Sequence, residues 1–160
     1  MTSNSPSEIL IALGANMPSR VGPPLETLKA ALAALGAAGV EILKVSSFYE
    51  TAAWPDPADP PFTNAAASLQ TSLQPVVLLE LLHDTETALG RVRSRKNAPR
   101  TLDLDLLAYR DVILDGTRLI LPHPRLAERR FVLEPLVEIA PEWRHPVTGL
   151  TPAQMLATLP

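Results

Sequence analysis

Two aspartates on one short segment carry the clearest chemical signal in this sequence. Residues 100–107 read RTLDLDLL, so Asp103 and Asp105 alternate with leucines. Side chains alternate along a β-strand, and both carboxylates would therefore share one face, about 7 Å apart. Carboxylate oxygens are ligands that Mg²⁺ takes while it bridges to phosphates. An amphipathic strand with a solvated polar face explains the same spacing equally well.

A basic segment directly precedes the acidic pair. Its five positive charges are Arg91, Arg93, Arg95, Lys96 and Arg100. Guanidinium groups bind phosphate oxygens with two parallel hydrogen bonds, so the two segments together favour a metal–polyphosphate site over a solvated charge run. No lysine of the chain follows a glycine, and the sequence therefore contains no Walker-type phosphate loop.

The distribution of charge favours a small anionic ligand. The chain has 160 residues and a net charge of −3, yet residues 91–130 contain 10 Lys and Arg against 5 Asp and Glu. A local basic patch on an acidic body suits a small polyanion better than a nucleic acid. The alternative is a ferredoxin-like nucleic-acid-binding module that uses residues 91–100. It is weakened by the absence of an aromatic-rich RNA-binding pattern.

Length and composition predict one folded domain over residues 1–160. Hydrophobic residues make up 46% and charged residues 19%, which excludes a disordered chain. The chain has no cysteine, so disulfides and thiolate metal sites are excluded. The apolar run 9–15 is too short for a membrane span and lacks the basic flank of a signal peptide. We therefore expect a cytoplasmic protein that binds no membrane.

The elements that must position these groups follow the order β-α-β-β-α-β. Strands are predicted over 8–14, 40–51, 62–72 and 101–109, with helices over about 23–39 and 75–90. This order is typical of an α+β, ferredoxin-like antiparallel sheet. A hairpin that turns at Asp115 and Gly116, and helices over 128–139 and 152–159, form a C-terminal extension. We expect that extension to cover the other face of the sheet, so that helices pack on both faces.

Around the acidic pair, the sequence resembles the 6-hydroxymethyl-7,8-dihydropterin pyrophosphokinases of folate biosynthesis. The signature is KNAPRTLDLDLL at residues 96–107, and the similarity extends along nearly the whole chain. Further matching segments stand in the same order at 14–16 (GAN), 45–49 (VSSFY), 90–93 (GRVR), 121–123 (LPH) and 138–141 (EIAP). The resemblance implies transfer of pyrophosphate from ATP to the hydroxymethyl group of the pterin, with release of AMP.

The resemblance also implies roles for matching positions. Asp103 and Asp105 would hold two Mg²⁺ ions and, with Arg91, Arg93 and Arg100, would form the catalytic set. The residues expected around ATP are His83, Glu86, Arg91, Arg93, Arg100, Leu106, His123 and Arg129. Those expected around the pterin are Thr51, Ala52, Trp54, Phe62, Asn64 and Phe131. A flat pterin needs aromatic stacking faces and an amide, which Phe62, Phe131 and Asn64 supply.

A few positions depart from the family pattern. Ala15 stands where the family has a serine, Asn97 where a tryptophan closes over the pterin, Pro124 where a tyrosine often follows the histidine, and Phe62 where a tyrosine contacts the pterin. The metal and phosphate groups are retained, so these changes concern the pterin side.

Other interpretations stay open for single residues and for the chain. Packing alone also explains Trp54, Phe62 and Phe131, and an exposed helix position explains His83. A noncatalytic homologue that only binds ligands is disfavoured by the retained aspartates. No side chain stands out as a general base, and we expect a monomer.

Overall fold

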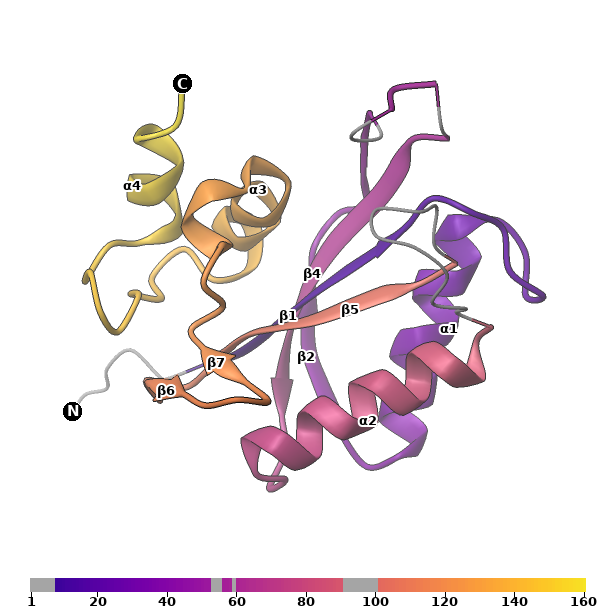
Figure 1. Cartoon of the computed structure of the whole chain (residues 1–160), viewed down its shortest axis with the longest axis horizontal. Helices are drawn as coiled ribbons and strands as arrows, with labels where there is room; N and C mark the ends of the chain where they lie inside the picture. Colours follow the sequence, from indigo (N-terminus) through magenta and orange to yellow (C-terminus); the bar gives the residue numbers. More distant parts are fainter. Residues whose placement is uncertain (1–7, 53–55, 59, 91–100) are drawn as a thin grey trace.

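An antiparallel sheet with the strand order β2–β4–β1–β5 forms the centre of the structure (Figure 1). The computed structural model describes residues 8–52, 56–58, 60–90 and 101–160. The strands are β1 (Ile9–Ala15), β2 (Glu41–Val45), β3 (Tyr49–Thr51), β4 (Phe62–Gln70) and β5 (Asp103–Tyr109). Every pairing in the sheet is antiparallel, and β3 pairs with β4 beside β2. The order confirms the predicted ferredoxin-like arrangement, in which the first and third strands of the unit lie in the middle.

Helices cover both faces of this sheet, as predicted (Figure 1). On one face, α1 (Pro24–Ala37) and α2 (Pro75–Ala88) pack on Ile9, Ile11 and Leu13 of β1 and form the first core with them. On the other face, α3 (Arg130–Ile139) and α4 (Pro152–Ala157) enclose a second core that includes Leu10 and Leu107. Alternate residues of β1 thus enter different cores, because successive side chains of a strand point to opposite faces. Among the described residues, no helix has the length and apolar character of a membrane span.

The predicted strand over 40–51 is interrupted at Ser46. The Ser46 N–H donates to the Ala66 carbonyl at 2.9 Å, and the Ser46 hydroxyl accepts from the Ala66 N–H at 2.9 Å. A side-chain oxygen thus replaces a backbone carbonyl in the ladder. Pairing with β4 resumes at Tyr49, which gives β2 and β3 instead of one strand.

The helix predicted over 128–139 begins later, at Arg130. A short 3₁₀ helix, η1 (Leu126–Glu128), precedes it, and Arg129 between the two has an extended backbone with φ −112° and ψ 102°. This break places Arg129 at the N-cap of α3.

The predicted hairpin is present, but its turn lies further along the chain. Asp115 belongs to β6 (Leu114–Asp115), where it pairs with Ile120 of β7 (Ile120–Leu121). The Gly116 N–H donates to the Leu119 carbonyl at 3.1 Å, which closes the turn over residues 116–119. The prediction of a turn at Asp115 and Gly116 was wrong by this shift, because a four-residue turn replaces the two-residue one.

Ser68 on β4 provides a test of the second core. Its side-chain oxygen is buried and has no hydrogen-bond partner within the described part of the chain. A buried unsatisfied hydroxyl costs about 1–3 kcal/mol, so Ser68→Ala should raise the free energy of unfolding by about 1 kcal/mol. Ser46→Ala is the matched control: it removes a buried hydroxyl that accepts from Ala66 and should lower the same quantity. Urea unfolding measures both free energies. An equal decrease in the two variants would contradict the conclusion that the Ser68 hydroxyl is unsatisfied.

His145 provides a pH test of the segment between α3 and α4. Its Nδ1 accepts from the N–H groups of Val147 at 3.2 Å and Thr148 at 3.3 Å, and burial lowers its pKa. As the pH falls, His145 is therefore protonated in the unfolded chain, where its pKa is about 6.5, before it is protonated in the folded protein. The free energy of unfolding should keep its full value above that pH and should decrease as the pH falls toward the folded pKa. Thermal unfolding of wild type and of His145→Asn is measured at both ends of this pH range. The unfolding temperature should decrease less in the variant, because an amide oxygen also accepts these hydrogen bonds but does not titrate there.

Candidate functional site

One row of residues crosses three adjacent strands of the sheet, β4, β1 and β5. Gly14 of β1 pairs with Asn64 of β4 on one side and with Asp103 of β5 on the other. Neighbouring strands are about 4.8 Å apart, so the backbones at Asn64 and Asp103 are separated by about 10 Å. The three residues share the sheet face of the second core, which Leu10 and Ala66 enter further along the strands.

Glycine at position 14 keeps the middle of this row open. A Cβ added there would lie 3.0 Å from Asn64 Oδ1 and 4.0 Å from Phe62 Cδ1. The first distance is shorter than an ordinary carbon–oxygen contact, so a larger residue would have to displace the Asn64 amide. A flat group can therefore approach the backbone of β1 between Asn64 and Asp103.

Three residues expected around the pterin meet at the Asn64 end of the row. Asn64 is 6% exposed, and its Nδ2 donates to Thr51 Oγ1 at 2.8 Å. Phe62 pairs with Thr51 and precedes Asn64 on the same face of β4. Because Nδ2 is engaged by Thr51, the amide oxygen Oδ1 is the group that faces the space above Gly14. This end of the row can accept a hydrogen bond from a ligand.

The acidic pair lies at the other end of the row, and its two residues alternate with the buried Leu104, as the strand pattern predicted. Asp103 and Asp105 are both partly exposed, and the intervening Leu104 is buried in the first core. Arg129 Nη1 lies 4.0 Å from Asp105 Oδ2, and the same guanidinium stacks 5.6 Å from the centre of the Phe131 ring. Phe131 itself is 40% exposed at the start of α3.

The donor set of this end fits a hard divalent cation only in part. Asp103 and Asp105 offer carboxylate oxygens on one face, which is the ligand type that Mg²⁺ takes. No group of three or more His, Cys, Asp or Glu among the described residues could hold a metal ion. Further oxygens are therefore needed, and the phosphates of a nucleotide are their usual source.

His123 is a neutral hydrogen-bond donor beside the acidic pair. Its backbone N–H donates to the Leu107 carbonyl at 2.8 Å, and its ring Nδ1 accepts from the Arg125 backbone N–H at 3.1 Å. Burial lowers the pKa of His123, with smaller contributions from Arg129 and Arg125 in the same direction and from Asp103 in the opposite one. Since Nδ1 accepts, the proton of the neutral ring is on Nε2.

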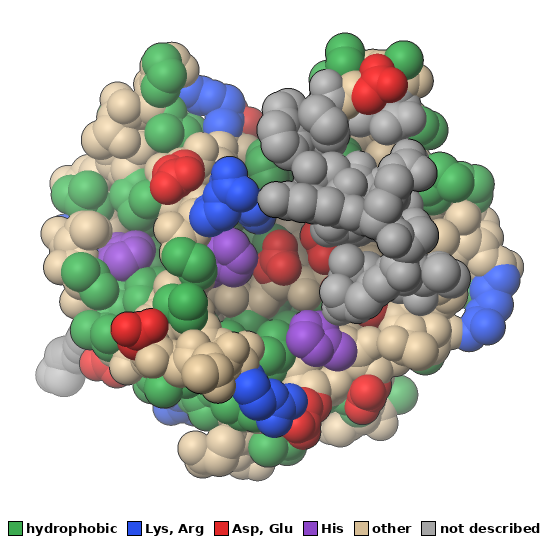
Figure 2. Space-filling view, in the orientation of Figure 1, with side chains coloured by type: hydrophobic (Ala, Val, Ile, Leu, Met, Phe, Trp, Pro, Cys, Tyr) green, Lys and Arg blue, Asp and Glu red, His purple; other side chains and the backbone are tan. Residues whose placement is uncertain are grey.

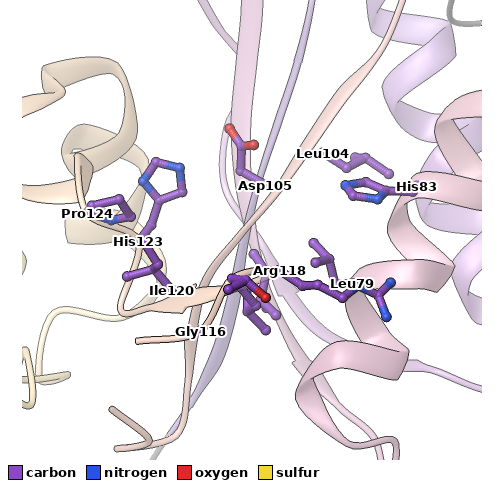
Figure 3. Close-up of a pocket in the computed structure, with 12 residues that line it drawn as sticks. Leu79, His83, Leu104, Asp105, Gly116, Arg118, Ile120, His123 and Pro124 are labelled. Atoms are coloured by element: carbon purple, nitrogen blue, oxygen red, sulfur yellow. The ribbon is translucent and has the colours of Figure 1, made fainter. Parts of the chain in front are cut away.

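A cavity of about 290 Å³ lies between α2, β5 and the β6–β7 hairpin (Figure 3). Figure 3 shows His83 and His123 on opposite sides, with Asp105 between them. The lining residues are Leu79, His83, Leu104, Asp105, Leu106, Gly116, Thr117, Arg118, Leu119, Ile120, His123 and Pro124. Histidine and acidic side chains gather at the centre of this face of the molecule, next to basic ones (Figure 2). The cavity thus joins an apolar wall to the charged end of the row.

Glu86 lies beneath this cavity, and it is not one of the lining residues. Its side chain is buried, at 2% exposed, and Oε2 accepts from the Leu104 N–H at 2.6 Å. The carboxylate therefore ties α2 to β5 directly behind the acidic pair.

The remaining expected residues are divided between the rim and the undescribed part of the chain. Ala52 is exposed immediately after β3. Trp54, Arg91, Arg93 and Arg100 lie outside the described residues, as do Arg95, Lys96 and Asn97.

The hairpin residues of the cavity were not expected from the sequence. Thr117 and Arg118 line it, and Arg118 also donates to Glu80 of α2 at 2.9 Å. A single arginine in a turn carries no local signal, because exposed turns are commonly charged. Only the position of the hairpin beside β5 reveals its part in the site.

Comparison with known proteins identifies the family of this chain. The family model described as 7,8-dihydro-6-hydroxymethylpterin-pyrophosphokinase (HPPK) matches residues 10–141. A Synechocystis protein named 2-amino-4-hydroxy-6-hydroxymethyldihydropteridine pyrophosphokinase is 43% identical over 148 residues, which cover 92% of this chain and 73% of that protein. The Bacillus subtilis protein of the same name is 45% identical over 143 residues, covering 87% of this chain and 81% of the relative.

Two longer proteins contain a similar region. The folic acid synthesis protein of Pneumocystis carinii is 40% identical over 143 residues. The matched region covers 89% of this chain and 19% of that protein. The crystal structure of wild-type Plasmodium falciparum HPPK-DHPS superposes with a TM-score of 0.71 at 14% identity. The superposition covers 99% of this chain and 45% of that one, and at this identity it supports the fold alone. The family model and the relatives above 40% identity carry the assignment, and this chain belongs to the 7,8-dihydro-6-hydroxymethylpterin-pyrophosphokinase family.

Proposed function

We propose that this chain transfers the terminal pyrophosphate of ATP to the hydroxymethyl oxygen of 6-hydroxymethyl-7,8-dihydropterin. In the reaction, that oxygen forms a bond to the β-phosphorus, and the bond between the β-phosphorus and the α–β bridging oxygen breaks. The electron pair leaves with AMP, and the hydroxyl proton passes to solvent or to a group of the nucleotide. The enzyme is accordingly an ATP-dependent diphosphotransferase.

The observation that carries this proposal is the row Asn64–Gly14–Asp103. Its ends pair with the same residue of β1, so an amide acceptor and a carboxylate stand on one face about 10 Å apart. A bicyclic pterin bound at Asn64 would direct its hydroxymethyl arm toward the acidic end. Such preset geometry supplies much of the acceleration in phosphoryl transfer, where positioning and charge neutralisation dominate.

At the acidic end, Asp103 and Asp105 would hold magnesium, and we infer two ions. Bound magnesium would neutralise phosphate charge and lower the pKa of the attacking hydroxyl. Arg129 would face the phosphates with its planar guanidinium, which Phe131 holds by stacking. His123 would donate a hydrogen bond from Nε2–H to a phosphate oxygen, and its neutral ring would add no charge. We assign Arg91, Arg93 and Arg100 to the same phosphates, on the resemblance alone.

The remaining residues would form the two organic subsites. For the nucleoside we propose His83 and Leu106, which line the cavity, and Glu86 behind it. For the pterin we propose Thr51, Ala52, Trp54, Phe62, Asn64 and Phe131. Asn64 Oδ1 would accept from the amino edge of the ring, since Nδ2 donates to Thr51.

We further infer that one chain suffices for activity and that the reaction belongs in the cytoplasm. The groups described above all come from a single chain, and the cytoplasm supplies ATP. Size-exclusion chromatography tests the monomer. The reaction itself is tested by the rate of AMP release from ATP with Mg²⁺ and 6-hydroxymethyl-7,8-dihydropterin. A rate equal to that measured without the pterin would contradict the proposal.

Asp103→Asn and Asp105→Asn should each lower turnover about 10²–10³-fold, because a metal at this position is worth several kcal/mol of charge stabilisation. The fold should persist, since the Asp105–Arg129 pair is partly exposed and such pairs contribute about 0–1 kcal/mol. Asp111→Asn removes the same charge from the exposed turn after β5 and should leave turnover unchanged. Steady-state AMP release and urea unfolding measure these effects. Loss of folding in the Asp103 or Asp105 variant would point to a structural role.

Arg129→Lys separates this enzyme from a nucleic-acid-binding module. Lysine keeps the charge but loses the planar fork and its stacking on Phe131, so AMP release should fall about tenfold, or about 1.4 kcal/mol. Non-specific binding of RNA depends on the number of phosphates neutralised and should be nearly insensitive to the change. By the same reasoning, Arg91→Lys and Arg100→Lys should lower AMP release. Unchanged AMP release together with tight, salt-dependent RNA binding would favour the nucleic-acid-binding module.

A further inference from the structure

The last turn of α3 carries a carboxylate with an unusual number of partners. Glu138 is exposed, yet the Ser47 N–H donates to both of its oxygens at 2.9 Å. The Ser47 hydroxyl donates to Oε2 at 2.9 Å, and the Tyr49 hydroxyl donates to Oε1 at 2.8 Å. These hydrogen bonds join residues about ninety positions apart in sequence, and three donors on one carboxylate restrict its position strongly.

The partners of Glu138 belong to the segment that leads from β2 into β3. Ser46 ties this segment to Ala66 of β4 from the opposite side, through its backbone and its hydroxyl. Lys44 Nζ also donates to the Ile139 carbonyl at 3.4 Å, at the negative end of the helix dipole. The C-terminal end of α3 is therefore held against β2 and β3 by several polar contacts.

Both attached elements lead directly to the site. Tyr49 pairs with Asn64, and Thr51, two residues further on β3, accepts from the Asn64 amide. At the opposite end of α3, Phe131 and Arg129 reach the site. A ten-residue helix is about 15 Å long, so a small tilt at Glu138 displaces Phe131 appreciably. The acidic pair and His123 are not part of this helix, and His123 is bonded to Leu107 of β5.

On the basis of the proposed function, we infer that Glu138 is a positioning residue for the pterin subsite. Its carboxylate fastens the end of α3 to the β2–β3 segment and thereby sets the separation between Phe131 and the Thr51–Asn64 pair. The nucleotide subsite is built on α2, β5 and the hairpin. It shares only Arg129 with the start of α3, and the ion pair with Asp105 of β5 holds that guanidinium independently of Glu138.

Glu138→Ala tests the inference by equilibrium binding. The dissociation constant for 6-hydroxymethyl-7,8-dihydropterin is measured with Mg²⁺ and an ATP analogue that has a methylene between the α- and β-phosphorus atoms. It should rise about tenfold, whereas that of the Mg²⁺ analogue alone should stay within about twofold. Glu138→Gln retains one acceptor oxygen and should fall between wild type and Glu138→Ala. With saturating pterin, kcat should change less than KM, because substrate positioning is impaired and the phosphate groups are not.

Glu134→Gln is the matched control. It removes the same charge from the same helix, where Glu134 pairs only weakly with Arg130 at 3.8 Å, and pterin affinity should remain that of wild type. Tyr49→Phe removes the hydrogen bond from Tyr49 to Glu138. As a single variant it should weaken pterin binding, whereas added to Glu138→Ala it should cause no further loss. This variant also serves if Glu138→Ala fails to fold.

The outcomes separate this inference from the proposed function. Active wild type with unchanged pterin affinity in Glu138→Ala and Tyr49→Phe would overturn the inference alone. An equal loss of pterin and nucleotide affinity would overturn it as well, because that result indicates general loosening. A folded wild type that binds neither ligand would contradict the proposed function and the inference with it.

Discussion

Gly14 stands between Asn64 and Asp103 because β1 pairs with β4 and β5 at once, in a register that both cores enforce. Ile9, Ile11 and Leu13 enter the first core and Leu10 enters the second, so a slip of one residue would exchange the two sets of side chains between faces. The same register places the amide and the carboxylate on opposite sides of one glycine. The energy that fixes the site is thus the burial of β1, and no functional side chain has to supply it.

The second core covers only part of its sheet face, and the site occupies the part that it leaves open. Leu107 and Ala66 belong to this core, while Asp105 and Asn64 stand two residues earlier on their strands, toward the row. Helix α3 therefore has two functions. Its apolar side, with Leu133 and Leu136, closes the core, and its first turn brings Phe131 and Arg129 to the edge of the open region.

Charge and polarity follow the same division. The cavity wall toward α2 and the hairpin is largely apolar, with Leu79, Leu106 and Pro124, and this suits the faces of a purine. Toward the row, Asp105, Arg129 and neutral His123 supply acceptors and donors suited to metal and phosphate. Pro124 stands where the family often has a tyrosine, so this wall offers an apolar surface without a hydroxyl.

Local patterns in the sequence determined the elements, the shared face of Asp103 and Asp105, and the family, because periodicity and short motifs need no knowledge of distant residues. The family resemblance also supplied the site residues, of which the structure brings Thr51, Phe62, Asn64, Asp105, His123 and Arg129 to one face. Tertiary structure alone decided what depends on contacts between distant segments. The pairing of Asn64 and Asp103 with one glycine depends on the register of β1 against β4 and β5. The approach of Arg118 to the cavity and of Glu138 to Ser47 depends on how the hairpin and α3 pack against the sheet, and no local pattern encodes that packing.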